Sequence, residues 1–136
     1  MSAHSVLGPI QAAVYATLTA NAPFMAVAKA VYDDVPELGG FPYVSFGEGT
    51  ENPWDTFGQN GSDATITLHV WSRYTGFKEA QAINDLMIGL LDNQTGIAVT
   101  GYGLVLLNVE NSVQLRDPDG ITRHIATRFR VMADAS

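Results

Sequence analysis

Cysteine is absent from this sequence of 136 residues, and its absence excludes several classes of protein. Without cysteine there is no disulfide framework, no cysteine-ligated zinc site and no thiol nucleophile. Long apolar runs are missing too, because no stretch approaches the roughly 18 residues of a membrane-spanning helix. The N-terminus has no positively charged region ahead of an apolar run, so we expect no signal peptide and no membrane contact.

Positive charge is scarce as well. Seven lysines and arginines stand against fourteen aspartates and glutamates, for a net charge of −7. A protein that coats duplex DNA is therefore not expected. Charged residues make up 15% of the chain, against about 25% in typical proteins, which indicates surface that does not all face water. The length predicts a single domain, residues 1–136, with an ordinary apolar core.

The spacing of apolar residues predicts two main helices and several strands. Helices are expected at 5–20, at 24–30 (short) and from Gly76 to about 91, with Glu79 placed for a capping box. Strands are expected at 31–32, 41–46, 63–73, 97–99, 104–115 and 121–132. Residues 117–120 read Asp-Pro-Asp-Gly, which predicts a tight turn joining the last two strands.

Residues 47–61 hold four glycines and one proline without a regular period, which predicts a long loop. The expected fold class is α+β, with two main helices packed on one face of a mainly antiparallel sheet and a long loop at about 47–61. Along the strand at 63–73, the side chains of Ala64, Ile66, Leu68 and Val70 are expected on one face, and those of Thr65, Thr67, His69 and Trp71 on the other.

Residues able to carry out chemistry are few. His69 and His124 would be neighbours if their strands pair, but no third ligand stands at metal-site spacing, so we predict no metal and no cofactor. Asp117-x-Asp119-Gly120 lacks the later ligands of a calcium loop. No Gly-x-Ser-x-Gly elbow is present. We therefore expect no catalytic residues and no enzyme.

Charge is segregated along the chain. No lysine or arginine occurs from residue 30 to residue 72, where seven acidic residues lie, whereas four of the seven positive charges fall between 116 and 130. One reading is solvated faces with ion pairs inside the chain. The other is self-association, in which an acidic surface of one copy meets a basic surface of the next. The residues predicted for this interface are Glu48, Glu51, Trp54 and Asp55 on the acidic side and Arg116, Arg123, Arg128 and Arg130 on the basic side.

Several strings, taken in order, resemble the tail terminator family of long-tailed bacteriophages, whose members are also called tail completion or tail-to-head joining proteins. They are Val31-Tyr32-Asp33-Asp34-Val35-Pro36, Phe41-Pro42-Tyr43-Val44-Ser45-Phe46-Gly47-Glu48, Leu68-His69-Val70-Trp71-Ser72-Arg73 and Arg116-Asp117-Pro118-Asp119-Gly120-Ile121-Thr122-Arg123-His124. Each string is weakly specific alone, and the ordered set is fairly specific. The resemblance extends from about residue 5 to residue 132.

The resemblance implies a structural virion protein at the head-proximal end of the tail, assembled in the cytoplasm of the host bacterium. It implies a homohexameric ring that caps the tail tube, ends tube polymerisation and offers a docking surface to the head connector or neck. DNA would pass through the ring without specific binding, and neither catalysis nor a cofactor is involved. The interface residues would then contact a neighbouring subunit or the tube protein.

Two other interpretations stay open at this stage. The nearer one is another head-completion or neck ring protein of the virion. The more distant one is a small cytosolic enzyme or ligand-binding domain that uses His69, His124 and nearby carboxylates. A pocket where these groups converge would favour the second.

Overall fold

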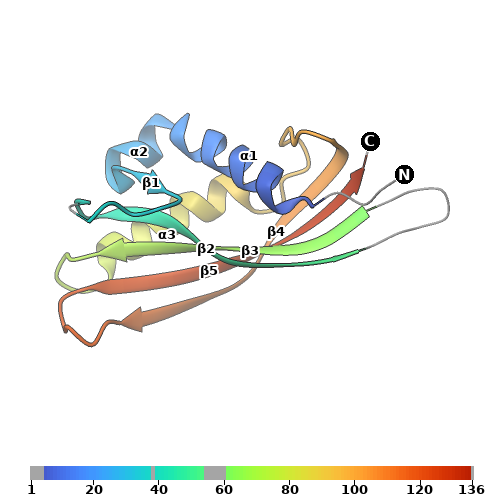
Figure 1. The fold of residues 1–136 in the computed structure, drawn as a ribbon. Helices are drawn as coiled ribbons and strands as arrows, with labels where there is room; N and C mark the ends of the chain where they lie inside the picture. The colour runs from blue at the N-terminus through green and yellow to red at the C-terminus, as the bar shows by residue number, and fades with distance from the viewer. Residues whose placement is uncertain (1–4, 38, 54–60, 136) are drawn as a thin grey trace.

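The computed structural model describes residues 5–37, 39–53 and 61–135. Its elements are α1 (Leu7–Thr19), α2 (Ala22–Ala28), β1 (Val31–Tyr32), β2 (Tyr43–Pro53), β3 (Gly61–Ser72), α3 (Lys78–Leu91), β4 (Tyr102–Arg116) and β5 (Arg123–Ala135) (Figure 1). The five strands form one sheet in the order β1-β2-β3-β5-β4. Only β1 and β2 run parallel, and the other neighbours are antiparallel. The expected α+β class is thus confirmed.

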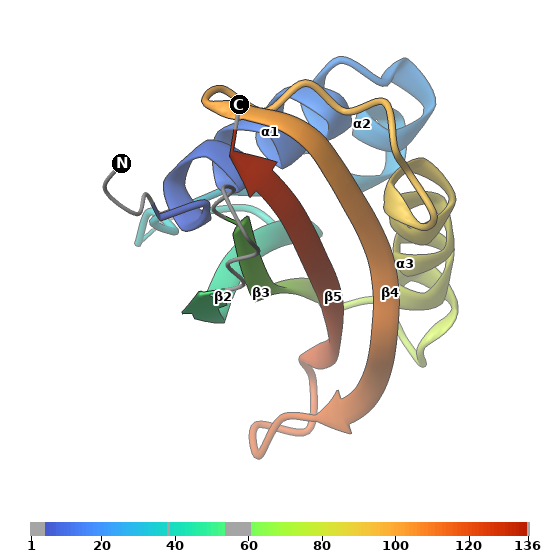
Figure 2. The same cartoon turned by 90° about the vertical axis from the view of Figure 1, so that its right-hand side faces the viewer.

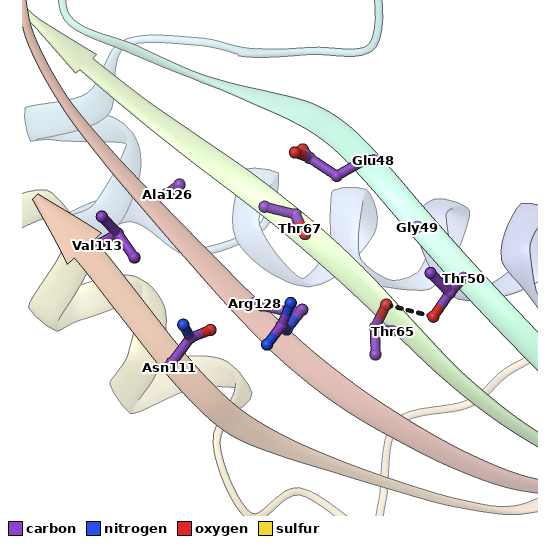
Figure 3. A pocket seen from close by; sticks show the side chains of 9 residues that line it. All are labelled: Glu48, Gly49, Thr50, Thr65, Thr67, Asn111, Val113, Ala126 and Arg128. Carbon is purple, nitrogen blue, oxygen red and sulfur yellow. Dashed lines mark hydrogen bonds between the residues drawn. The ribbon is translucent and has the colours of Figure 1, made fainter. Parts of the chain in front are cut away.

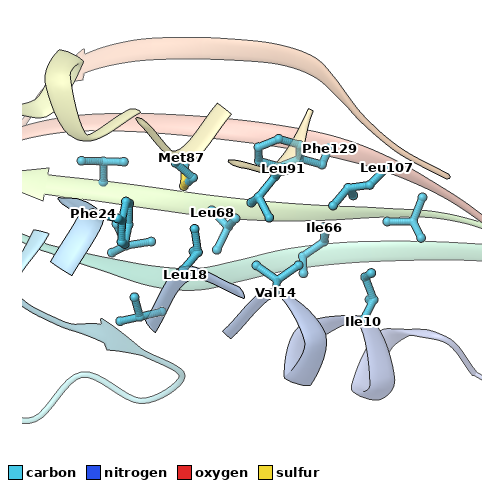
Figure 4. Packing of buried hydrophobic residues seen from close by; sticks show 14 of the residues in the cluster. Ile10, Val14, Leu18, Phe24, Ile66, Leu68, Met87, Leu91, Leu107 and Phe129 are labelled. Atoms are coloured by element: carbon cyan, nitrogen blue, oxygen red, sulfur yellow. The ribbon is translucent and has the colours of Figure 1, made fainter. Parts of the chain in front are cut away.

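The three helices cover one face of the sheet, and the core lies between the two layers (Figures 1 and 4). Helix α1 contributes Ile10, Val14 and Leu18, which are fully buried and four residues apart. This spacing puts them on one side of the helix. They pack toward inward-facing side chains of the strands, among them Leu68 and Phe129. Burying each such side chain contributes about 1.5–3 kcal/mol.

The three helices differ in how their N-terminal ends are capped. Asn21 caps α2, because its side-chain oxygen accepts a hydrogen bond from the Phe24 N–H at 2.9 Å. No side chain within the helix caps α1 or α3. For α1, one acceptor comes from β2, where the Glu51 carboxylate lies 2.7 Å from the Val6 N–H, and the Ser5 hydroxyl accepts from the Leu7 N–H at 3.3 Å. The predicted capping box of α3 is wrong: Phe77 is the N-cap residue, and Glu79 accepts a hydrogen bond from Ser72.

The predicted loop at about 47–61 is too long. Residues 47–53 continue β2, and Gly61 already belongs to β3; residues 54–60 lie outside the described residues. Glycine misled the prediction, because here it serves close packing within a strand. A Cβ on Gly47 would lie 2.2 Å from Nε2 of His69, and glycine in a strand often marks such an approach or a bulge.

The strand expected at 97–99 is also absent from this part of the structure. Residues 97–99 run without regular structure beside β4, and Val99 is buried against the core. The apolar character that suggested a strand therefore reflects burial without sheet pairing.

The sheet is bent, and strand pairing is irregular in β2 and in β4, which flank the central strands β3 and β5. Register shifts lie between Phe46 and Gly49 in β2 and, in β4, between Tyr102 and Leu104 and between Val109 and Asn111. An extra residue on one strand bends that strand and increases its twist. Figure 2 shows β4 and β5 as long curved strands with α3 on the outer side of the bend.

Candidate functional site

The face of the sheet opposite the helices, called the open face from here on, carries most of the candidate residues. Residues of β3 and β5 that are direct partners share a face, so Thr65, Thr67, His69 and Trp71 lie beside Arg130, Arg128, Ala126 and His124. The predicted orientation of the β3 side chains is therefore confirmed. No helix in the described part of the chain is long and apolar enough to span a membrane.

A cluster of rings joined by hydrogen bonds lies on the open face. His69 Nε2 is 2.7 Å from the Glu48 carboxylate, and His69 Nδ1 is 2.5 Å from His124 Nε2. The His124 ring stacks on Trp71, with ring centres 3.9 Å apart and planes 10° apart. The indole N–H of Trp71 donates to the Ser45 hydroxyl at 3.0 Å. The sequence-based expectation that the two histidines are neighbours if their strands pair is thus confirmed.

The hydrogen bonds of this cluster constrain its protons. The Glu48 carboxylate only accepts, so His69 donates from Nε2; with both rings neutral, His124 then donates from Nε2 to Nδ1 of His69. Burial, and next the charge on His69, lower the pKa of His124. Hydrogen bonds from its own backbone N–H and from His69 lower the pKa of Glu48. The arrangement therefore favours neutral His124 beside ionised Glu48.

A shallow hollow of about 180 Å³ opens on the same face (Figure 3). Its lining comes from all four long strands and consists of Glu48, Gly49, Thr50, Thr65, Thr67, Asn111, Val113, Ala126 and Arg128. The Thr50 and Thr65 hydroxyls are 2.7 Å apart in a hydrogen bond across it. Neither histidine lines this hollow, so the pocket that would favour an enzyme or ligand-binding domain is not formed there.

The acidic residues predicted for an interface are mostly engaged within the chain. Glu48 bonds to His69, and Glu51 accepts from the Ser5 hydroxyl and the Val6 N–H, both at 2.7 Å. Burial raises the pKa of Glu51, but these hydrogen bonds, with one from Ser62, bring it below its usual value. Glu51 therefore anchors the start of α1. Trp54 and Asp55 lie outside the described residues.

Two of the predicted arginines lie on the open face and are paired there. Arg130 bonds to Asp63 through two parallel contacts of 3.0 and 2.8 Å, and Arg128 bonds to Glu110 at 2.6 Å. The Arg130 hydrogen bond lowers the pKa of Asp63. Both pairs are exposed to solvent, where such pairs contribute about 0–1 kcal/mol.

The other two arginines lie on the helix side of the sheet. Arg116 and Arg123 are direct partners at the end of the β4–β5 pair, and both guanidinium groups lie near the Phe77 ring, at 5.7 and 5.8 Å. Within the described part of the chain neither has a carboxylate partner. Sequence reasoning did not separate these two arginines from Arg128 and Arg130, although strand alternation predicts opposite faces for Arg123 and Arg128.

Residues 5–37, 39–53 and 61–135 offer no metal-binding site. No group of three or more histidines, aspartates or glutamates there is arranged to hold a metal ion. What the site offers is an extended surface of paired charges, hydroxyls and rings on a bent sheet. Such a surface suits contact with another macromolecule more than turnover of a small molecule.

Comparison with known proteins agrees with this class of structural, surface-presenting protein. The chain belongs to the family described as tail completion protein gp17, whose model matches residues 12–134. The tail completion protein gp17 of Bacillus phage SPP1 is 27% identical over 124 residues, covering 90% of this chain and 91% of that protein. The family resemblance drawn from the sequence is therefore confirmed, and the role of the chain is structural, in tail completion.

Two solved structures resemble the fold. A chain in the virion of a native gene transfer agent particle superposes with a TM-score of 0.87 at 28% identity, covering 98% of this chain and all of that one. The structure of SPP1 gp17 superposes with a TM-score of 0.58 at 25% identity, covering 90% and 88%.

Proposed function

We propose that this protein is a virion component that forms a ring, most simply a homohexamer, on the head-proximal end of a tail tube. The ring ends polymerisation of the tube and offers a surface to the head connector or neck. The observation that supports this most is the similarity over 98% of the chain to a chain of an assembled virion particle. Family membership supports the location at the tail, and assembly would take place in the host bacterial cytoplasm.

The predicted interface residues keep their role in this proposal with one adjustment. Glu48, Arg128 and Arg130 line or border the open face, where their intrachain pairs leave carboxylate and guanidinium edges exposed. They would therefore set register and partner choice at the rim of a contact more than supply its affinity. Glu51 is better explained as a helix anchor.

DNA would pass through the ring without specific binding. Each copy carries a net charge of −7, and phosphates are repelled by surfaces of the same sign. This part of the proposal fails if the purified protein binds duplex DNA tightly at physiological salt.

The test of the ring is the native mass of the purified protein by light scattering across a concentration series, alone and with tail-tube protein. The expected result is a mass of six subunits at high concentration or on addition of tube. The tube ends should then stop growing, as seen by electron microscopy. A protein that stays monomeric and leaves tube growth unchanged would contradict the proposal.

A further inference from the structure

Strand β4 lies at the edge of the sheet, and the residues that the structure describes cover only half of its outer side. The N–H and C=O of Leu107 pair with Gln94 at 3.0 and 3.1 Å, and the Val109 N–H donates to the Asp92 carboxylate at 2.7 Å. Beyond the bulge at Val109–Asn111, this cover ends. In the covered half, the backbone groups of Leu107 and Val109 that make these hydrogen bonds point away from β5.

The register extends this reading to the open half of the edge. The backbone N–H and C=O of Leu107, which pairs with Val131, point away from β5. The backbone groups of every β4 residue opposite an odd-numbered residue of β5 therefore point the same way. After the bulge these are Ser112, Gln114 and Arg116. Their outward N–H and C=O groups have no partner in the described part of the chain.

Between the bulge and Arg116, this open half has little of the usual protection of an edge strand. Residues 111–115 contain neither charge nor proline, the devices that natural proteins place on exposed edges. Val113 and Leu115 are 43% and 45% exposed, although they are apolar. An unprotected edge beside exposed apolar side chains is the setting in which an added strand is recognised.

Positive charge without a carboxylate partner stands at the end of this edge, where the Arg123 guanidinium donates to the backbone carbonyls of Gly120 and Ile121 at 3.3 and 2.6 Å. Arg116 and Arg123 have no carboxylate within ion-pair distance in the described residues. Arg123 Nε is also buried without a hydrogen-bond partner. A buried donor left unpaired is destabilising, so an acceptor brought by a partner would stabilise this end.

The complementary charge lies at the other edge of the same sheet. Strand β1 forms that edge, and the segment after it carries Asp33, Asp34 and Glu37, all exposed. None of the three is in an ion pair within the described residues. The other acidic residues that the structure describes in this half of the chain, Glu48, Glu51 and Asp63, are already bonded.

We propose that the open half of β4 binds the acidic segment 31–37 of a second copy as an added strand, with Asp33 and Glu37, which share one face of that strand, facing Arg116 and Arg123. This inference rests on the proposed ring and names the contact that builds it. The two surfaces lie on opposite edges of one sheet, so the contact is head-to-tail and repeats from copy to copy. Such contacts close into a ring when the rotation allows.

The backbone part is tested with Gln114→Pro against Gln114→Ala. Both variants lose the side-chain hydrogen bond to Gln81, but only proline removes the outward N–H. Light scattering should show a ring for Gln114→Ala and at least a tenfold weaker association for Gln114→Pro, with both monomers folded by circular dichroism. Equal association of the two variants would overturn the inference while leaving the ring intact.

The pairing itself is tested by disulfide trapping, since the chain has no cysteine of its own. In Asp33→Cys/Gln114→Cys, four strand spacings, about 19 Å, separate the two sites within one copy, too far for an internal disulfide. Oxidation should therefore give a ladder of covalent multimers. Each single variant should stop at dimers, and Asp85→Cys/Gln114→Cys should give no ladder.

A wild-type ring with no ladder from Asp33→Cys/Gln114→Cys would overturn this contact alone. A wild type that stays monomeric, with no ladder, would overturn the contact and the ring together. Charge pairing has its own readout: Arg116→Glu should weaken association, and Asp33→Arg/Glu37→Arg in the same chain should restore it.

Discussion

A single glycine shows how closely the open face is packed at the scale of one residue. Gly47 lies under the His69 ring, and any Cβ there would come within 2.2 Å of Nε2 and 2.4 Å of Cδ2. The ring would have to leave its hydrogen bonds to Glu48 and His124. We expect Gly47→Ala to lower the free energy of unfolding by about 1–3 kcal/mol, measured by urea denaturation.

Gly40→Ala is the matched control for this change, because a Cβ at Gly40 would meet nothing within 4 Å. It should leave stability within about 0.5 kcal/mol of the wild type or raise it slightly. If both substitutions cost the same, the tight approach of His69 to Gly47 is not what holds this part of β2.

At the scale of one element, α1 depends on a residue 45 positions away from its start. Glu51 on β2 accepts from the Val6 N–H and the Ser5 hydroxyl. We expect Glu51→Ala to cost about 1–2 kcal/mol, the range for loss of a helix cap or a charged hydrogen bond. Hydrogen exchange should show faster exchange in the first turn of α1.

Glu110→Ala serves as the control for Glu51→Ala. It also removes a carboxylate from a strand, but one that holds an exposed ion pair with Arg128. Its cost should be below about 1 kcal/mol, and α1 should exchange as in the wild type. Equal protection of α1 in both variants would contradict the anchoring role of Glu51.

Element types were predictable where the apolar period is clear, as along β3 and α3. Sequence alternation also put His69 and Trp71 on the same face. It missed the continuation of β2 through residues 47–53, because glycines that admit a close neighbour look like loop glycines. The partners of the charges were not predictable, since Arg128–Glu110 depends on the pairing and bulge between β4 and β5.

For the whole molecule, the histidine cluster predicts a stability that depends on pH. The pKa of His124 lies below its usual value of 6.5 in the folded chain, chiefly through burial, with His69 lowering it and Asp117 and Glu48 opposing. The unfolded chain thus takes up this proton first as pH falls. The stability that neutral His124 contributes is fully present above about pH 6.5 and is lost as the pH falls through the pKa of His124 in the folded chain.

We expect the free energy of unfolding to fall between pH 7.5 and pH 5.5, by at most about 1.4 kcal/mol per pH unit for one proton. Urea denaturation of wild type and His124→Gln over this range measures the effect, and the variant should show a smaller slope. Equal slopes would exclude His124 as the source. The pKa values of Glu48, Glu51 and Asp63 are lowered, so the stability that these carboxylates contribute is lost only at more acidic pH.

The bulges at Phe46–Gly49 and Val109–Asn111 have a consequence for the size of an assembly. They occur in β2 and β4, on either side of the central pair β3 and β5. Together they add a fixed bend to a sheet whose long strands would otherwise run straighter. If copies join edge to edge, the diameter of the closed assembly follows from the bend of each copy. Removing one residue at either bulge would then change the bore of the channel, while the strand order of each copy stayed the same.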